Sequence, residues 1–361
     1  MQIYIHRAFS TSRAGPDGVG NIRRLGAIRS PMIEALGQKR LIYVTGKGGV
    51  GKSTITAALG RALANQGKRT LIIETDAFSA MPDLLGIGKE VTGPDPAGEN
   101  LWAENLEASE CFVRTLTRFV PSERISRAVV QNKVARVFFN AAPSVNEFVI
   151  LDQIFEEAER KEGGEFVYDH VIVDLPASGH AVTFLSVPQT LYGMMKVGPI
   201  AKRARQLADE IRDERRTAIV AVCLPEEMPV NETIELSENL RESLDRELTG
   251  VIINMVHSLP VDPSRREVFE NVLSQLRDEG QVDEDSIHNA DGPALSKLVA
   301  GNALALGWYD RDQHYLGLLK ERVDAPVTPV PVIYDDSSVR IVDALAEQLT
   351  QPDGAENAAA S

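Results

Sequence analysis

The fold of this chain is decided by the stretch Leu41–Thr54, LIYVTGKGGVGKST. It opens with the aliphatic, β-branched and aromatic residues that favour a buried strand. A glycine-rich turn follows, and its residues Gly46–Ser53 match the spacing G-x-x-x-x-G-K-[ST]. Beyond the turn, the alanine-rich segment Ile55–Asn65 has the spacing of an amphipathic helix. A strand, this turn and a helix in that order predict a loop that binds the phosphates of a nucleoside triphosphate.

Each residue type in the turn suits that chemistry. Glycines let consecutive backbone N–H groups surround phosphate oxygens without Cβ clashes, and the helix directs the positive end of its dipole at the same anion. Lys52 is placed to reach the β- and γ-phosphates, and the Ser53 hydroxyl is a ligand for Mg²⁺. The alternative is a glycine-rich turn with a chance lysine. The residues that we expect to contact ATP here are Gly46, Gly48, Gly49, Val50, Gly51, Lys52, Ser53 and Thr54.

The chain as a whole has 361 residues and a formal net charge of −14. This length allows one large α/β domain with an insertion. The negative charge argues against a nucleic-acid partner, because such surfaces are normally basic. Cys111 and Cys223 are far apart and form no C-x-x-C motif, which is typical of core residues in a reduced, cytoplasmic protein. No apolar run approaches the ~20 residues that span a bilayer.

Short apolar runs separated by helical segments continue along the chain. Leu101–Leu106 is a further candidate strand, and the Gly- and Pro-rich stretch Gly86–Glu99 is expected to be a loop. Such alternation predicts an α/β fold with a doubly wound, mostly parallel sheet. The other expected strands are Thr70–Glu74, His170–Asp174, Thr217–Leu224, Gly250–Val256 and Val327–Tyr334.

The domain organisation predicted from these patterns is a nucleotide-binding domain over residues 39–350 with an inserted helical subdomain. The helical subdomain is expected at about 107–165 and 185–216, the first of these without strands. Residues 1–38, rich in arginine, are expected to be a disordered leader. They superficially resemble a transit peptide, and a start at Met32 is the alternative. The tail 351–361 is expected to be disordered.

Two acidic residues follow apolar strands and complete a hydrolytic site. Asp76, after TLIIE, is placed to orient or deprotonate the attacking water. Its alternative role is a helix N-cap. Asp174 ends the run VIVD, where a buried strand would present it to the Mg²⁺ shell, most simply through water. Gly179 lets a backbone N–H approach the γ-phosphate, and loss of that phosphate would release the segment.

These motifs resemble the ArsA family of ATPases. The form GKGGVGKST is similar to the deviant phosphate loop of the MinD/ParA/ArsA class, and this resemblance implies that Lys47 reaches the nucleotide of a partner protomer. DLPASGHAVTFL resembles the ArsA switch II signature, with Leu175 and the order of Ala and Pro as departures. TDAFSAMPDLLG resembles switch I, with Asp76 on the water-activating aspartate and Ala77 replacing a proline.

The resemblance covers about residues 39–349 and implies further roles. Glu226, in CLPEEMPVNET, matches an acid that approaches the nucleotide across a dimer, and Asn254 matches an asparagine that reads adenine. A turn-forming asparagine is the alternative for Asn254. The family also implies a homodimer, or a heterodimer with a paralogue, that uses ATP and Mg²⁺ to bind and release a client. Apolar residues of the helical part, among them Phe112, Leu116, Phe119, Val120, Val137, Phe138, Phe139, Met194 and Met195, would line a groove for an apolar protein client or form ordinary core.

Two other activities fit the same phosphate loop. A MinD/ParA-type positioning ATPase would use the same cycle but needs an amphipathic membrane helix or a basic DNA-binding face, and the tail QPDGAENAAAS supplies neither. A small-molecule kinase would transfer the phosphate to a metabolite. Arsenite activation is disfavoured because the two cysteines are scattered and there is one phosphate loop.

Overall fold

The computed structural model describes residues 31–75, 78–91, 93–117, 143–282 and 293–351. Asp76 and the predicted groove residues Phe119, Val120 and 137–139 therefore lie outside the described residues. The same holds for the predicted leader before residue 31 and for the predicted tail after Gln351.

The centre of the molecule is an eight-stranded sheet in the order β10-β9-β8-β1-β7-β2-β4-β3. Neighbouring strands are parallel except for the edge pair β3 and β4. The predicted α/β class with a mostly parallel sheet is thus confirmed. The strands are β1 (Leu41–Gly46), β2 (Thr70–Glu74), β3 (Asp95–Gly98), β4 (Leu101–Asn105), β7 (His170–Asp174), β8 (Thr217–Cys223), β9 (Gly250–Val256) and β10 (Val327–Pro331).

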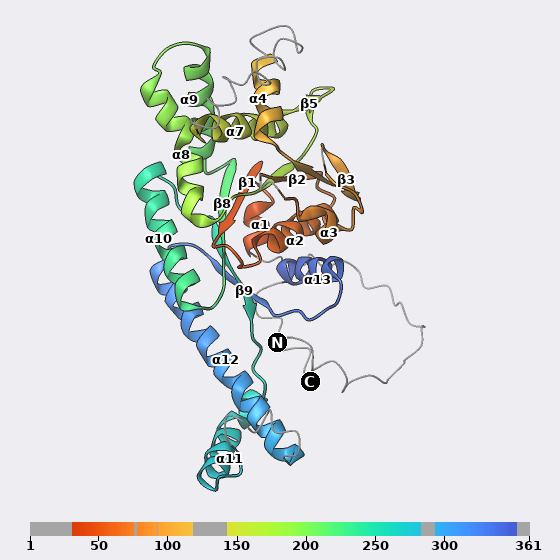
Figure 1. Ribbon diagram of the computed structural model, residues 1–361, viewed down its shortest axis with the longest axis vertical. Helices are drawn as coiled ribbons and strands as arrows, with labels where there is room; N and C mark the ends of the chain where they lie inside the picture. The colour runs from red at the N-terminus through yellow and green to blue at the C-terminus, as the bar shows by residue number, and fades with distance from the viewer. Residues whose placement is uncertain (1–30, 76–77, 92, 118–142, 283–292, 352–361) are drawn as a thin grey trace.

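Helices cover both faces of this sheet, because the central strands are apolar on both sides (Figure 1). Along β1, Leu41 and Tyr43 belong to one buried cluster and Ile42 and Val44 to the other. One face is covered by α1 (Pro31–Leu36), α2 (Lys52–Asn65), α3 (Met81–Leu85) and α13 (Ser338–Thr350). The opposite face is covered by α7 (Pro143–Glu159), α8 (Ser178–Met194), α9 (Pro199–Arg212), α10 (Glu227–Leu244) and the end of α12 (Ala294–Arg322).

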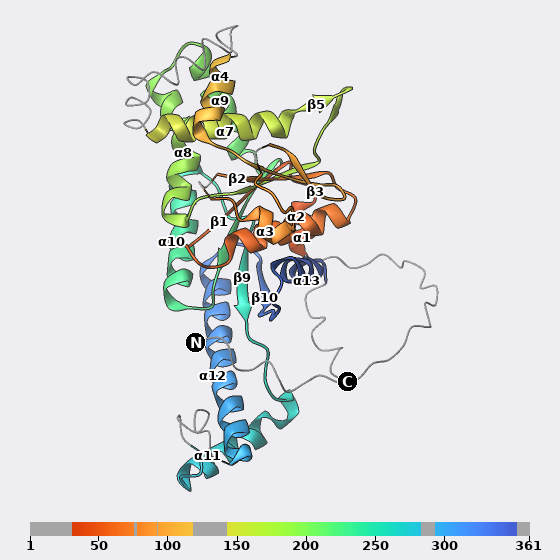
Figure 2. The same ribbon diagram turned by 45° about the vertical axis from the view of Figure 1, so that its right-hand side comes forward.

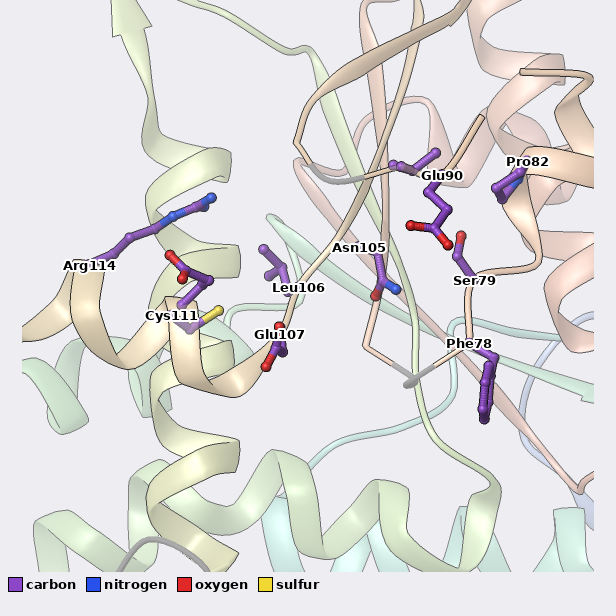
Figure 3. Close-up of a pocket in the computed structure, with 11 residues that line it drawn as sticks. Phe78, Ser79, Pro82, Glu90, Asn105, Leu106, Glu107, Cys111 and Arg114 are labelled. Atoms are coloured by element: carbon purple, nitrogen blue, oxygen red, sulfur yellow. The ribbon is translucent and has the colours of Figure 1, made fainter. Parts of the chain in front are cut away.

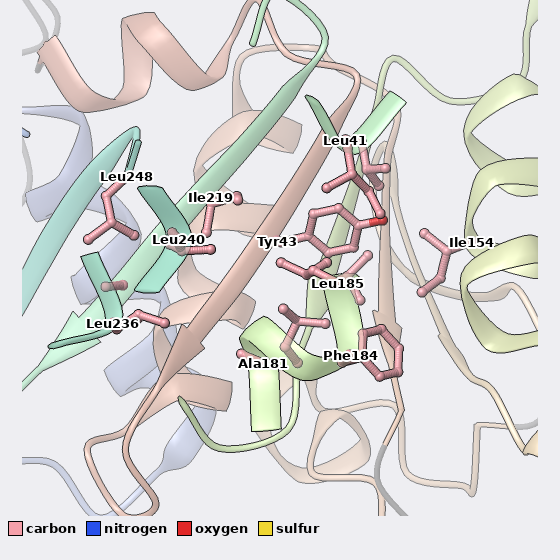
Figure 4. Close-up of a cluster of buried hydrophobic side chains, with 14 of the residues drawn as sticks. Leu41, Tyr43, Ile154, Ala181, Phe184, Leu185, Ile219, Leu236, Leu240 and Leu248 are labelled. Carbon is pink, nitrogen blue, oxygen red and sulfur yellow. The ribbon is translucent and has the colours of Figure 1, made fainter. Parts of the chain in front are cut away.

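The buried cluster that contains Leu41 and Tyr43 shows how the helical part is attached. In Figure 4, Ala181, Phe184 and Leu185 of α8 pack beneath Tyr43 of β1, and Ile154 of α7 lies beside them. α8 therefore starts at the nucleotide-binding edge of the sheet and continues into the layer formed with α4 (Ala108–Thr117), α7 and α9 (Figure 2). A movement at the start of α8 would be transmitted to that layer.

Three elements correct the expectations from sequence. Residues 31–36 were expected to be disordered, but α1 is a helix whose Met32, Ile33 and Leu36 are buried. The expected loop 86–99 contains β3, whose Pro96 is tolerated because β3 is an edge strand. The expected strand-free region 107–165 ends in a two-stranded ribbon of β5 (Lys161–Glu162) and β6 (Glu165–Phe166).

A helical arm forms the other end of the molecule. It consists of α11 (Arg266–Asp278) and the N-terminal half of α12, which extend away from the sheet (Figures 1 and 2). A small cluster around Leu273 and Val299 holds the two helices together. In the described part of the chain, no helix is long and apolar enough to cross a membrane.

Candidate active site

The phosphate loop connects β1 to α2 at the carboxyl edge of the sheet, where nucleotides bind in open α/β folds. Two of its glycines are required by close approach. A Cβ on Gly46 would lie 2.3 Å from the backbone oxygen of Val222 in β8. Gly51 has a left-handed φ of +85°, and a Cβ there would lie 2.5 Å from Nδ2 of Asn254. The exposed Gly48 and Gly49 form the crest of the loop.

Asp174 at the end of β7 is where the predicted ATP- and Mg²⁺-binding side chains meet. Its carboxylate is 2.5 Å from the Lys52 ammonium and accepts a 2.5 Å hydrogen bond from the Ser53 hydroxyl. The Thr56 hydroxyl adds a longer contact of 3.4 Å. Asp174 is only 3% exposed, so its charge is balanced by Lys52 in a poorly solvated site. The sequence interpretation missed Thr56, one helical turn after Lys52.

The Ser53 and Asp174 pair fits a magnesium ion. Mg²⁺ prefers oxygen ligands and is usually held by few protein groups together with water and phosphate oxygens. The Ser53 hydroxyl and the Asp174 carboxylate supply such oxygens within hydrogen-bond distance of each other. The parallel register of β1 with β7 pairs Val44 with Asp174, which fixes the acid beside the phosphate loop.

Switch I begins directly after β2. Thr75 donates a hydrogen bond from its hydroxyl to the Asp174 backbone oxygen over 3.2 Å, so switch I is tied to the next strand. Glu74, which the sequence interpretation did not single out, is buried and holds the far end of the segment. Its carboxylate accepts hydrogen bonds from the Ser79 hydroxyl and from the backbone N–H groups of Ala80, at 2.8 Å, and Met81. Burial raises the pKa of Glu74 above its ordinary value, against the effect of these hydrogen bonds.

Switch II is largely helical. α8 begins at Ser178, so Gly179 and His180 lie exposed in its first turn and not in an extended loop. Leu175 donates its backbone N–H to the Val44 oxygen over 2.9 Å, which continues the ladder past Asp174. The first turn of α8 thus follows Asp174 and the end of β7 after only three residues.

Lys47 contacts its own protomer. Its ammonium lies 2.6 Å from Oε1 of Glu232, in the second turn of α10. Glu226 is the exposed N-cap residue of the same helix, whose start follows β8. α10 therefore carries both acidic groups, Glu226 and Glu232, to the edge of the phosphate loop. Glu232 was not predicted, although its charge within CLPEEMPVNET was a visible signal.

Asn254 supports the phosphate loop from β9. It is buried, and its Nδ2 donates a 3.0 Å hydrogen bond to the Val50 backbone oxygen. Met255 follows in a left-handed conformation with φ of 58°. One of the two N–H groups of this amide therefore supports the loop. Its predicted contact with adenine stays a prediction.

A pocket of about 470 Å³ lies beside switch I, away from the phosphate loop (Figure 3). It is formed by residues 78–82 of the switch I segment, by residues 90–91, by the end of β4 and by the first turns of α4. Lining residues include Phe78, Ser79, Asn105, Leu106, Cys111 and Arg114. Burial raises the pKa of the Cys111 thiol to about 12, so this cysteine is chemically inert under neutral conditions.

A strand, a glycine loop and a helix whose lysine and serine meet the aspartate of a neighbouring strand define a P-loop nucleotide-binding protein. Residues 39–208 match the family model described as "Anion-transporting ATPase". The protein named ATPase BagA of Mycobacterium tuberculosis is 28% identical over 322 residues, covering 87% of this chain and 84% of the relative. A putative arsenical pump-driving ATPase of Aquifex aeolicus is 25% identical over 276 residues, covering 66% and 88%.

ATPase GET3 of Lachancea thermotolerans is a further relative, 26% identical over 255 residues, covering 60% of this chain and 71% of its own length. The family match includes the phosphate loop, switch I and switch II. The family match over residues 39–208 and these relatives support an ArsA-type ATPase, as the motif resemblance implied, and the chain is an ATPase.

Proposed function

We propose that this protein is a Mg²⁺-dependent ATPase that works as a nucleotide-gated dimer and couples the cycle to binding and release of a client. The observation that carries the proposal is the convergence of Lys52 and Ser53 on buried Asp174. In the structure Asp174 balances the charge of Lys52. Lys52 would bind the phosphates of ATP, and Ser53 and Asp174 would hold Mg²⁺, which would supply positive charge at the phosphate oxygens.

The cis half of the site comprises residues 46 and 48–54. The backbone N–H groups of the loop bind the β-phosphate, and the backbone of Gly179 in switch II approaches the γ-phosphate. Asp76 orients the attacking water and accepts its proton. Hydrogen bonds at both ends of the switch I segment support that role: Thr75 donates to the Asp174 backbone oxygen, and Ala80 donates to the Glu74 carboxylate.

The trans half comes from a second protomer, either another copy or a paralogue. Lys47 reaches the partner's phosphates, and Glu226 approaches the partner's nucleotide. Glu226 is exposed at the start of α10 and Lys47 is partly exposed in the phosphate loop, which supports a role across an interface. In a symmetric dimer two nucleotides and two lysines would then be shared across the interface, so ATP closes the dimer and hydrolysis opens it.

The client is proposed to bind the layer of α4, α7, α8 and α9, which we regard as the inserted helical subdomain. At the turn between α8 and α9, four apolar side chains are exposed, with Met194 at 77% and Val197 at 86%. Exposed methionines adapt to varied apolar partners. Met195 and Ile200 complete this group. We place this activity in the cytoplasm, without a nucleic-acid partner, because the chain carries a net charge of −14 and two reduced, buried cysteines.

The proposal is tested in two steps. First, phosphate release from ATP is measured with Mg²⁺ and with EDTA, and the mass of the protein is measured by light scattering with ATP and with ADP. Second, a fluorescent apolar helical peptide of about 20 residues serves as a client probe. We expect Mg²⁺-dependent hydrolysis, a dimer in ATP, and nucleotide-dependent probe binding that is weakened by Met194→Asp. Hydrolysis by a monomer, with probe binding that is unaffected by nucleotide, would overturn the gated dimer.

A further inference from the structure

Glu232 holds the trans lysine on its own protomer. The Lys47 ammonium and the Glu232 carboxylate are 2.6 Å apart, which is the distance of a charge-assisted hydrogen bond. The two side chains are 28% and 37% exposed, so the pair is partly shielded from solvent. Lys47 is not needed to shape the turn, so the conformation of the phosphate loop does not depend on its contact with Glu232.

The position of Glu232 is fixed by the packing of α10. Val230 and Ile234, on either side of it, are buried against the core that includes β8 and α8. Thr233 donates its hydroxyl to the Pro229 backbone oxygen over 2.8 Å, which stabilises the first turns of the helix. The carboxylate is therefore presented from a rigid element, whereas Lys47 is a long side chain between Gly46 and Gly48.

The Lys47 side chain cannot contact Glu232 of its own protomer and the phosphates of a partner at the same time. An ammonium is a compact charge whose stabilisation depends on close approach, and its interaction with a carboxylate falls steeply when the two separate. Contact with phosphates on another protomer requires the side chain to extend away from its own α10. The contact with Glu232 thus favours the open, unpaired protomer over the closed dimer.

We propose that Glu232 is a positioning residue that retains Lys47 on its own protomer until an ATP-loaded partner docks. This inference rests on the proposed trans role of Lys47. A residue that forms the interface would strengthen the dimer, whereas Glu232 is proposed to weaken it. Removal of its charge strengthens the ATP-dependent dimer, because the closed state no longer has to break the ion pair.

The size of the effect follows from the exposure of the pair. Partly exposed ion pairs alter an equilibrium by about two- to fivefold each. A symmetric dimer breaks one such pair on each protomer, so Glu232→Gln should raise the association constant by about four- to 25-fold. Glu235→Gln is the matched control. Glu235 is exposed about one turn further along α10, and its substitution removes the same charge.

The test is sedimentation velocity with Mg²⁺ and a non-hydrolysable ATP analogue. We compare the wild type, Glu232→Gln, Glu235→Gln, Lys47→Ala and the double variant Lys47→Ala/Glu232→Gln. We expect tighter association for Glu232→Gln alone, and no effect of that substitution once Lys47 is absent. A weaker or unchanged dimer in Glu232→Gln, or the same gain in Glu235→Gln, would overturn the proposal.

The same series separates this inference from the proposed function. If Lys47→Ala associates like the wild type, the trans lysine itself is wrong. If Lys47→Ala fails to associate but Glu232→Gln is unchanged, only the role of Glu232 is wrong. If the wild type stays monomeric, a second measurement applies. Lys47 is acetylated with acetic anhydride in the absence of nucleotide, and the extent of modification is followed by mass spectrometry. We expect several-fold faster modification in Glu232→Gln than in Glu235→Gln, and equal rates would contradict the retention of Lys47.

Discussion

Ser53 and Asp174 lie 121 positions apart in sequence, yet the serine hydroxyl donates a 2.5 Å hydrogen bond to the aspartate carboxylate. Ser53 lies in the first turn of α2 and Asp174 is the last residue of β7, and the parallel pairing of β1 with β7 places these two elements side by side. The two oxygens of the proposed Mg²⁺ site are thus brought together by the sheet and the start of α2.

Replacement of Asp174 by asparagine should separate catalysis from folding. The amide keeps the size of the side chain but loses the charge that holds Lys52 and would hold the Mg²⁺ shell. We expect ATP hydrolysis to fall by about 100-fold or more, the effect of losing a preorganised electrostatic group. Asp169→Asn is the matched control, because Asp169 pairs with Arg69 at the opposite end of the same strand. Equal loss of phosphate release in both variants would contradict the assignment.

Substitution of Gly51 by alanine should destabilise the protein more than the same change at Gly67. Both glycines have a left-handed φ, +85° and +79°, which costs an L-residue about 1–2 kcal/mol. At Gly67 an added Cβ has open space, whereas at Gly51 it would displace Asn254 and its hydrogen bond to Val50. We expect an additional loss of about 1–3 kcal/mol at Gly51. Urea denaturation measures both, and equal losses would show that Asn254 does not brace the loop.

The helical layer should loosen locally when Asp152 is removed. Asp152 of α7 is fully buried and accepts hydrogen bonds from Thr115 of α4, at 2.8 Å, and from Arg203 of α9. Asp152→Ala removes the hydrogen-bond acceptor of Thr115 and one acidic partner of the half-buried Arg203, which keeps Glu156, at a cost of about 1–3 kcal/mol. Hydrogen exchange should rise in α4, α7 and α9 and remain low in β1 and β8. The control Asp209→Ala removes an exposed pair with Arg205 and should change little. Uniform exchange throughout the chain would contradict a separate helical subdomain.

Glu74 should make stability depend on pH with a defined sign. Burial raises its pKa in the folded state above the unfolded value near 4.5, so ionisation opposes folding. The contribution of the neutral carboxyl is complete below the unfolded pKa and is lost as pH rises through the folded pKa. Glutamine does not titrate. The unfolding free energy of the wild type minus that of Glu74→Gln should therefore fall as pH increases from about 4, then level off. A difference that rises with pH would mean that the hydrogen bonds to Ser79, Ala80 and Met81 outweigh burial.

The elements of the fold that are determined by local sequence patterns could be predicted. The phosphate loop and the continuous apolar strands, such as β2 and β7, follow from residue type and spacing, and so does the parallel sheet. The edge strand β3 was missed because its formation depends on pairing with β4, not on its own Pro- and Gly-containing sequence. α1 was missed because six residues carry little periodic signal, and its stability comes from burial of Met32, Ile33 and Leu36.

The candidate site shows the same division. Ser53, Lys52 and Asp174 lie in motifs whose chemistry is tied to spacing, and the structure brings them together. Glu232 and Glu74 act through tertiary contacts with Lys47 and with the start of α3, which no local pattern encodes. Asn254 was assigned from resemblance to a base-reading role, and its contact with the Val50 oxygen became visible only when β9 was placed beside the phosphate loop.

The most direct test of the shared site is activity in a mixture of two variants. Lys47→Ala retains its own Asp174 but supplies no lysine to its partner, and Asp174→Asn supplies the lysine but lacks its own acid. Each should be nearly inactive alone. When they are mixed in equal amounts, half of the dimers are mixed and each has one complete site, so about a quarter of the wild-type ATPase rate should return. No recovery from two folded variants that associate, or full activity of Lys47→Ala alone, would contradict a site shared between protomers.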